Sequence, residues 1–348
     1  MTSPTASRAV RLRRADCNGP GIRRRRHGRG FRYVSTDGER LDDPEILERI
    51  GELVIPPAWE DVWICPYPGG HIQATGIDAR GRKQYLYHSR WREQRDRQKF
   101  DDMLAFAKRL RRMRDRVEAD LAGPRFSREQ ILACSVRLLD RGFFRIGTED
   151  YAVENETYGL ATIRREHVTV RGETLVFDYP AKHGKRRVQA ILDEDVAAIV
   201  SGLLRRRGGG EELLAFKRDR RWIDVKSADI NVYVKQAVGR GVSAKDFRTW
   251  GATVLAAVSV AVAEPHVTSK TARKRAETNA VREVAHYLGN TPAVARGSYI
   301  DPRVFDRFAA GETIAAALPK LGAHEGAPAI QGPIERAVLR LLDEGPVT

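Results

Sequence analysis

Five polar side chains within residues 145–299 are of the types needed to break and rejoin a phosphodiester. In chain order they are Arg145, Lys182, Arg248, Asn290 and Tyr299. A tyrosine phenol can attack phosphorus and form a new phosphodiester that stays open to the reverse attack, so the bond energy is kept. Arginines suit the non-bridging oxygens, because a planar guanidinium matches two of them and keeps its charge. A lysine near other cations has a lowered pKa and can protonate a leaving oxygen, and an amide can donate one more hydrogen bond.

The first three of these residues lie beside predicted elements that could hold them. Arg145 follows a helix predicted from the capping-box sequence that starts at Ser127 and the apolar repeat behind it. Lys182 lies in a predicted hairpin turn. Arg248 begins the most apolar predicted helix, Ser243–Val262, so we expect that helix to be buried and its arginine to be held rigidly.

The last two residues flank a predicted break between helices. Gly289 is a typical stop for the predicted helix Thr268–Leu288, and Thr291 followed by proline is a typical start for the next one. Asn290 therefore sits on a stiff corner, and Tyr299 follows it by one short helix. Taken singly, each of these residues would be an ordinary surface or turn residue, and only their joint occurrence indicates a site.

The composition indicates a polyanionic partner. The chain has 348 residues, with 61 lysines and arginines against 46 acidic residues and a formal net charge of +15. Nucleic acid is the first candidate for such a partner. Three scattered cysteines are too few for a disulfide framework or a zinc site. The longest uncharged stretch, residues 249–263, is too short to cross a bilayer.

Two lobes of different class are predicted, which makes the fold α+β. Short alternating runs separated by turn residues predict strands at Phe31–Val34, Val62–Cys65, His71–Thr75 and Gln84–Tyr87, with one helix near Pro44–Leu53. One long charged helix is expected over Arg90–Glu118. Mainly helices follow, interrupted by strands near residues 168–177. The expected divisions are a basic flexible segment 1–30, a β-rich DNA-binding domain 31–95, a helical connector 96–122, a mainly helical catalytic domain 123–315 and a tail 316–348.

Several longer motifs accompany the five residues. They are Ile55–Trp59, Gly81–Tyr87, Gly142–Gly147 with Tyr151, and Glu154–Leu160, together with the basic run Pro20–Arg26. With the order Arg, Lys, Arg, Asn, Tyr, this set resembles the type IB DNA topoisomerases, specifically their small bacterial and poxviral branch. The resemblance covers roughly residues 20–315.

The resemblance implies a catalytic domain of the tyrosine recombinase and topoisomerase IB type. It implies an enzyme that nicks one strand of duplex DNA through a 3′-phosphotyrosyl link, relaxes positive and negative supercoils by strand rotation, and reseals without ATP, metal or any other cofactor. Tyr299, Arg145, Lys182, Arg248 and Asn290 would be catalytic. Further DNA contacts are expected from Arg82, Lys83, Gln84, Tyr85, Tyr87, Tyr151, Lys245 and Arg296.

One position departs from the commonest pattern of that family. Many members carry histidine where this chain has Asn290, although the bacterial branch uses asparagine. An amide keeps the hydrogen bond to phosphate but carries no charge. We therefore expect Asn290 to act as a neutral donor, and we assign neither His183 nor His286 to catalysis.

Two alternatives remain open from the sequence. A tyrosine recombinase or integrase shares the Arg, Lys, Arg, Tyr set, but it normally has a histidine where this chain has Lys245, and a helical rather than β-rich clamping domain. A non-catalytic DNA-binding protein on the same scaffold would not need all five polar residues. The expected partner is duplex DNA, preferably supercoiled, bound by a monomer in the cytoplasm at the nucleoid, with no membrane association.

Overall fold

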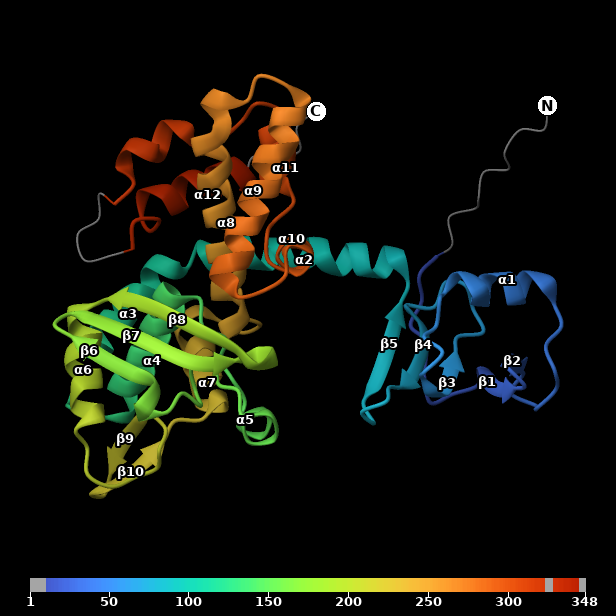
Figure 1. The fold of residues 1–348 in the computed structure, drawn as a ribbon, viewed down its shortest axis with the longest axis horizontal. Coiled ribbons are helices and arrows are strands. Elements are labelled where there is room, and N and C mark those ends of the chain that lie inside the picture. Colours follow the sequence, from blue (N-terminus) through green and yellow to red (C-terminus); the bar gives the residue numbers. More distant parts are fainter. Residues whose placement is uncertain (1–10, 323–327, 344–348) are drawn as a thin grey trace. The chain divides into compact units, whose positions relative to one another are not determined.

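The chain folds as two compact units, divided between Phe100 and Asp101 (Figure 1). The computed structural model describes residues 11–322 and 328–343, and only the backbone of Tyr151 and His183. Within these residues, no helix is both long and apolar enough to cross a membrane. The division into a β-rich and a mainly helical unit agrees with the α+β class predicted from the sequence.

The first unit is built on one antiparallel sheet of five strands in the order β2-β1-β3-β4-β5. The strands are β1 (Ile22–His27), β2 (Gly30–Val34), β3 (Glu60–Ile64), β4 (Ile72–Ile77) and β5 (Lys83–Tyr87). Helix α1 (Pro44–Glu52) begins where the Asp43 carboxylate accepts the backbone N–H groups of residues 45 and 46. Its Ile50 joins Ile22, Ile64 and Ala74 in the core of the unit.

Strand β1 corrects one expectation, because it lies in the segment 1–30 that was expected to be flexible. Its arginines alternate between the two faces of the strand. Arg24 is 9% exposed, and its guanidinium donates to the backbone oxygens of Ile55, Pro56 and Trp59. The inward arginine is thus held by three backbone oxygens while Arg25 faces solvent, so a run of arginines can form a strand.

Helix α2 (Ser89–Ala107) leaves the first unit and ends in the second, where α3 (Leu110–Leu121) follows it. The single long helix expected over residues 90–118 is therefore wrong: the chain makes a turn at Lys108 and Arg109, where the N–H of Arg109 bonds to the oxygen of Phe106, three residues earlier. The sequence gives no proline or glycine at this break. Met103, Leu110, Met113 and Val117 are buried, so these helices contribute to the core of the second unit.

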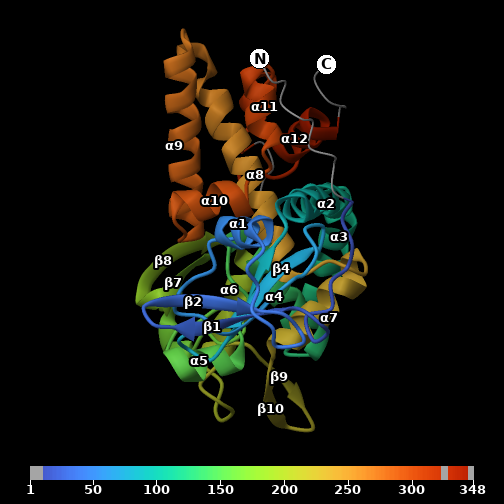
Figure 2. The same cartoon turned by 90° about the vertical axis from the view of Figure 1, so that its right-hand side faces the viewer.

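Among the described residues, the second unit contains nine further helices and two small sheets. The helices are α4 (Arg128–Gly142), α5 (Glu149–Asn155), α6 (Glu194–Leu204), α7 (Ser227–Val238), α8 (Ala244–Ala263), α9 (Lys270–Leu288), α10 (Pro292–Ser298), α11 (Arg303–Ala309) and α12 (Pro333–Asp343). The sheets are β6 (Val168–Arg171), β7 (Thr174–Ala181) and β8 (Lys185–Leu192), and β9 (Ala215–Arg218) with β10 (Arg221–Asp224). Helices α8 and α9 run side by side (Figures 1 and 2), and the β7–β8 hairpin packs beside α4.

Helix α12 lies in the stretch that was expected to be a tail. Its residues Ile334, Ala337, Val338 and Leu342 are buried, and the helix packs on α8 and α11. This apolar face repeats at helical spacing, which is why the stretch folds onto the domain. The strands predicted near residues 168–177 and the helices predicted at Ser243–Val262 and Thr268–Leu288 are found where the sequence placed them, whereas α7 and the β9–β10 hairpin were missed.

Candidate active site

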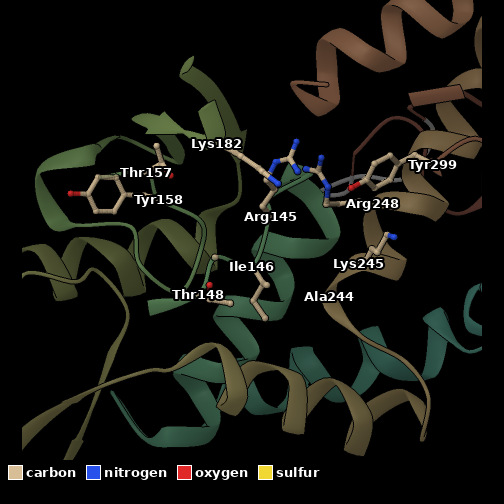
Figure 3. A pocket seen from close by; sticks show the side chains of 11 residues that line it. Arg145, Ile146, Thr148, Thr157, Tyr158, Lys182, Ala244, Lys245, Arg248 and Tyr299 are labelled. Carbon is tan, nitrogen blue, oxygen red and sulfur yellow. The ribbon is translucent and has the colours of Figure 1, made fainter. Parts of the chain in front are cut away.

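A cavity of about 280 Å³ in the second unit brings together four of the five residues predicted to be catalytic (Figure 3). Arg145, Lys182, Arg248 and Tyr299 all line it. The side chains of Lys182, Arg145 and Arg248 converge, and the hydroxyl of Tyr299 points toward Arg248 (Figure 3). Lys245 also lines the cavity. None of the described residues that line it is acidic, so the cavity has the charge of an anion site.

Arg248 is held by the carboxyl ends of two helices. It lies on α8, whose first turn is fixed by a capping box between Ser243 and Asp246, and it is 3% exposed. Its guanidinium donates to the backbone oxygen of Phe143, at the end of α4, and to that of Leu288, at the end of α9, 3.0 Å away. Helix carboxyl ends carry partial negative charge, which offsets the burial of the cation.

Burial lowers the pKa of Arg248 to about 10, and the nearby Arg145 and Arg187 lower it too, against the opposing effect of Tyr299. Since this value is well above neutral pH, the guanidinium stays charged there. A buried cation held by two carbonyl oxygens retains hydrogen-bonding capacity: its Nε is buried and has no partner among the described residues. Arg248 is therefore positioned before any ligand arrives.

Tyr299 ends helix α10 and is 8% exposed. Burial opposes its ionisation, but Arg248, Arg145 and Lys245 together outweigh burial and lower the pKa of the phenol. The guanidinium carbon of Arg248 lies 5.3 Å, and Nζ of Lys245 5.7 Å, from the centre of the ring. The site thus stabilises the phenolate, the nucleophilic form, relative to an ordinary tyrosine.

The backbone around Tyr299 is tied to α8 by a residue that the sequence did not single out. The hydroxyl of Thr253, fully buried on α8, donates to the backbone oxygen of Tyr299 at 3.3 Å and accepts from the N–H of Asp301 at 3.1 Å. Since Arg248 lies on the same helix, this contact fixes the distance between the arginine and the tyrosine. A threonine in the uncharged part of a helix gives no signal of such a role.

Arg145 lies in the loop after α4, and two glycines fix the path of that loop. Gly147 (φ +74°) faces Gly159 so closely that a Cβ on either would come within 3 Å of the other's backbone. The N–H of Leu160 also bonds to the oxygen of Arg145 at 2.8 Å. This close approach, which only glycine permits, places Arg145 on the wall of the cavity.

Asn290 meets Arg145 although it does not line that first cavity. Its Oδ1 accepts a hydrogen bond from the Arg145 guanidinium. Gly289 caps α9 with φ +63°, and the Thr291 side chain caps the start of α10, as the sequence predicted. The Nδ2 of Asn290 is buried and has no partner among the described residues, so one donor remains available.

The remaining predicted site residues fall in different places. Lys182 is the first residue of the turn between β7 and β8, as predicted, and is exposed. Arg296 does not line the cavity: its guanidinium lies 3.5 Å from Glu277 and over the ring of Phe305. Tyr151 lies on α5, and its side chain is outside the described part of the chain, as is that of His183.

The first unit carries the other five predicted contacts on β5 and the turn before it. Lys83, Tyr85 and Tyr87 are exposed on one face of β5, and the two tyrosine rings stack with centroids 6.1 Å apart. Arg82 and Gln84 instead both donate to the Asp78 carboxylate, at 2.8 Å each. The Arg82 side chain holds the pKa of Asp78 below its usual range.

Comparison with known proteins identifies the class. The family described as "Eukaryotic DNA topoisomerase I, catalytic core" matches residues 88–310, and "Bacterial DNA topoisomerase IB, N-terminal domain" matches residues 30–78. The chain therefore belongs to the type IB DNA topoisomerase family, and it is an isomerase with the function of that family.

Named relatives come from viruses. DNA topoisomerase 1B of Acanthamoeba polyphaga mimivirus is 28% identical over 288 residues, which cover 80% of this chain and 85% of that protein. DNA topoisomerase I of monkeypox virus is 21% identical over 234 residues, and DNA topoisomerase 1B of vaccinia virus (strain Copenhagen) is 20% identical over 234 residues. Each of these two matches covers 67% of this chain and 71% of the relative.

Proposed function

We propose that Tyr299 is the nucleophile of a reversible strand-cleavage reaction on duplex DNA, and that four residues around it serve the same step. The observation that carries this proposal is the cavity in which Arg145, Lys182 and Arg248 surround a buried phenol, with no acidic side chain among its described lining residues. A phosphodiester brings negative charge, which such a site would neutralise.

The step balances as follows. The phenolate oxygen of Tyr299 attacks phosphorus and the bond from phosphorus to the 5′ oxygen breaks, leaving the 3′ phosphate on the tyrosine. Arg145, Arg248 and the Nδ2 of Asn290 bind the non-bridging oxygens, whose charge develops in the transition state. Lys182 gives a proton to the departing 5′ oxygen. Resealing is the same sequence in reverse, after the free 5′ end has rotated.

The role of Lys182 has its own test. Lys182→Ala should cleave slowly on normal DNA, and a 5′-bridging phosphorothiolate should restore much of the rate, because a thiolate leaves without a proton. Lack of rescue would assign Lys182 to charge neutralisation or binding instead.

The proposal extends to the whole protein. We propose that it acts as a monomer on supercoiled duplex DNA at the nucleoid in the cytoplasm. The β-rich first unit, which includes β1, would be a DNA-binding domain, and the mainly helical second unit would be the catalytic domain. Lys83, Tyr85, Tyr87, Tyr151 and Lys245 would contact DNA. Arg82 and Gln84 would contact it only by giving up Asp78, and Arg296 by giving up Glu277.

The decisive experiment is relaxation of positively and negatively supercoiled plasmid in EDTA without nucleotide, with Tyr299→Phe as the control. We expect full relaxation by the wild type. The variant should bind DNA almost normally but form no covalent adduct, because only the nucleophilic oxygen is lost. An absolute requirement for Mg²⁺ or ATP, or an adduct on another residue such as Tyr287, would overturn the assignment.

A further inference from the structure

A second cavity of about 450 Å³ adjoins the first and shares Arg145, Tyr158, Lys182 and Arg248 with it. Its other wall comes from strand β8 and from the carboxyl end of α9. Among its described lining residues there is again no acidic side chain. The shared arginines and lysine thus lie between two adjacent cationic cavities. Of the residues that line only the second cavity, the proposed cleavage step uses Asn290 alone.

Three cations, Lys185, Arg186 and Arg187, line the second cavity but not the first, and of these only Arg187 is half-buried rather than exposed. Its Nε donates to Gln189 at 2.7 Å, and one terminal nitrogen donates to the backbone oxygen of Tyr287 at 2.7 Å. Its other terminal nitrogen would lie only 3.1 Å from a Cβ at position 289, where the chain has glycine. The guanidinium therefore lies against the corner that carries Asn290, and the strand carrying it follows the turn that begins with Lys182.

The described residues that line the cavity around Arg187 include several cations and no carboxylate. Burial lowers the pKa of Arg187, and the like charge of Arg145 lowers it further, while the adjacent Tyr179 opposes this. The nearest acid on the paired strand, Asp178, is engaged by Arg186 at 2.5 Å. Half-buried arginines facing one another without a carboxylate oppose folding, so an anion that lies between them would be bound favourably.

We propose that Arg187 forms a second phosphate subsite, which binds a phosphodiester next to the scissile one on the cleaved strand. The inference rests on the proposed function, because it places the scissile phosphate at the wall shared by the two cavities. A strand bound there must continue past that wall with its next phosphate close by. The second cavity supplies a guanidinium for that phosphate, and Arg187 would hold the strand so that the scissile bond stays in line with Tyr299.

The test is a double-mutant cycle between the arginine and single phosphates. Single-turnover cleavage is measured on duplexes that carry one neutral methylphosphonate at each phosphate flanking the scissile bond. We expect one position to slow the wild type by roughly tenfold to a hundredfold, as for loss of a hydrogen bond to a charged group. Arg187→Gln should cleave normal DNA more slowly by a comparable factor. Its cleavage rate should fall little further on the duplex in which that phosphate is neutral.

Control variants separate this subsite from a bracing role. Arg171→Gln removes the same charge at the far end of the same sheet and should show no coupling. Arg187→Lys should keep part of the coupling through its charge. If every methylphosphonate slows Arg187→Gln as much as it slows the wild type, Arg187 only braces the end of α9 and the subsite does not exist.

Failure of the subsite and failure of the proposed function give different results. A wild-type protein that forms no adduct on any substrate would refute the proposed function. The same coupling is therefore also measured in equilibrium binding, which needs no cleavage. Coupling at one phosphate in binding would still support the subsite, and its absence in both measurements would refute the subsite alone.

Discussion

Three cations lower the pKa of the Tyr299 phenol: Arg248 and Lys245 lie on α8, and Arg145 lies in the loop after α4. Arg248 is fixed by two backbone oxygens, Arg145 by the loop after α4, and Lys245 by the first turn of α8. Burial would raise the pKa of the phenol, and the cations reverse that effect. In the proposed reaction these cations would therefore activate the phenol by stabilising its ionised form.

This arrangement predicts how the rate of cleavage responds to pH. The phenolate gains population as pH rises through its pKa, so the rate should rise with pH and level off below the ordinary tyrosine value of about 10. Lys245→Gln removes one cation, so the midpoint of the single-turnover pH profile should move upward. Arg296→Gln also removes one positive charge, but outside the cavity, and should leave the midpoint of the pH profile unchanged. An unmoved midpoint in Lys245→Gln would contradict this role of Lys245.

Asn290 should act as a neutral donor whose oxygen also holds Arg145. Loss of one transition-state donor removes about 2.7–4 kcal/mol, so Asn290→Ala should slow single-turnover cleavage on the order of a hundredfold or more. Asn290→Asp should be slower still, because it sets a negative charge against the phosphate, and Asn290→His should keep substantial activity through its N–H. A harmless alanine would leave Asn290 as a turn residue only.

At the scale of elements, the domain is held around α8 by a buried charge network that α12 completes. Glu335 of α12 accepts from Trp250 of α8 at 2.9 Å and from Arg114 of α3 at 2.6 Å. Arg114 also bonds to Asp140 of α4 at 2.8 Å. Burial opposes the charge of Arg114, but the two carboxylates outweigh it and raise its pKa. Trp250 lies two residues from Arg248, so α12 supports the part of α8 that carries Arg248.

Removal of one partner from this network should destabilise the protein strongly. Glu335→Ala leaves Trp250 and part of Arg114 unpaired in the interior, and we expect the free energy of unfolding to fall by about 3 kcal/mol, the lower end for a broken buried pair. Chemical denaturation of the full chain measures this free energy of unfolding. Glu283→Ala, at an exposed position on α9, should change it by less than about 0.5 kcal/mol. Equal midpoints for the two variants would mean that α12 adds no support.

At the scale of the whole molecule, the net charge of +15 is distributed over both units. The exposed face of β5 offers one lysine and two stacked tyrosines, while the neighbouring arginine is compensated by Asp78. Binding by this face would add phosphate contacts outside the catalytic unit. Each such contact makes the affinity for DNA more sensitive to salt.

Lys83 should therefore contribute to the salt dependence of DNA binding. Lys83→Gln should weaken binding of duplex DNA and reduce the slope of log affinity against log salt by roughly 0.9, the value for one phosphate contact. Arg40→Gln, an exposed cation of the same unit already paired with Asp42 at 2.7 Å, should reduce the slope less. An unchanged slope in Lys83→Gln would place β5 away from the DNA.

The sequence by itself determined the features that depend on residues a few positions apart. Two kinds of feature are local, since each involves neighbours within about four residues. They are the alternating exposure along β5 and the helix caps at Ser127, Ser243, Gly289 and Thr291. These features located the corner that carries Asn290 and the ends of the helices around Arg248. The order of the catalytic types, joined to the family resemblance, then indicated the function.

Only the tertiary structure decided which distant groups complete the site. Arg248 is held by an oxygen 40 residues away, Arg187 bonds to one 100 residues away, and Arg114 meets Glu335 across 221 residues. Such pairs arise from packing, and their residue types are those of any surface arginine or glutamate. For the same reason the strand character of residues 22–27 and the buried face of α12 became clear only in the fold: each needs a partner surface that the local pattern does not contain.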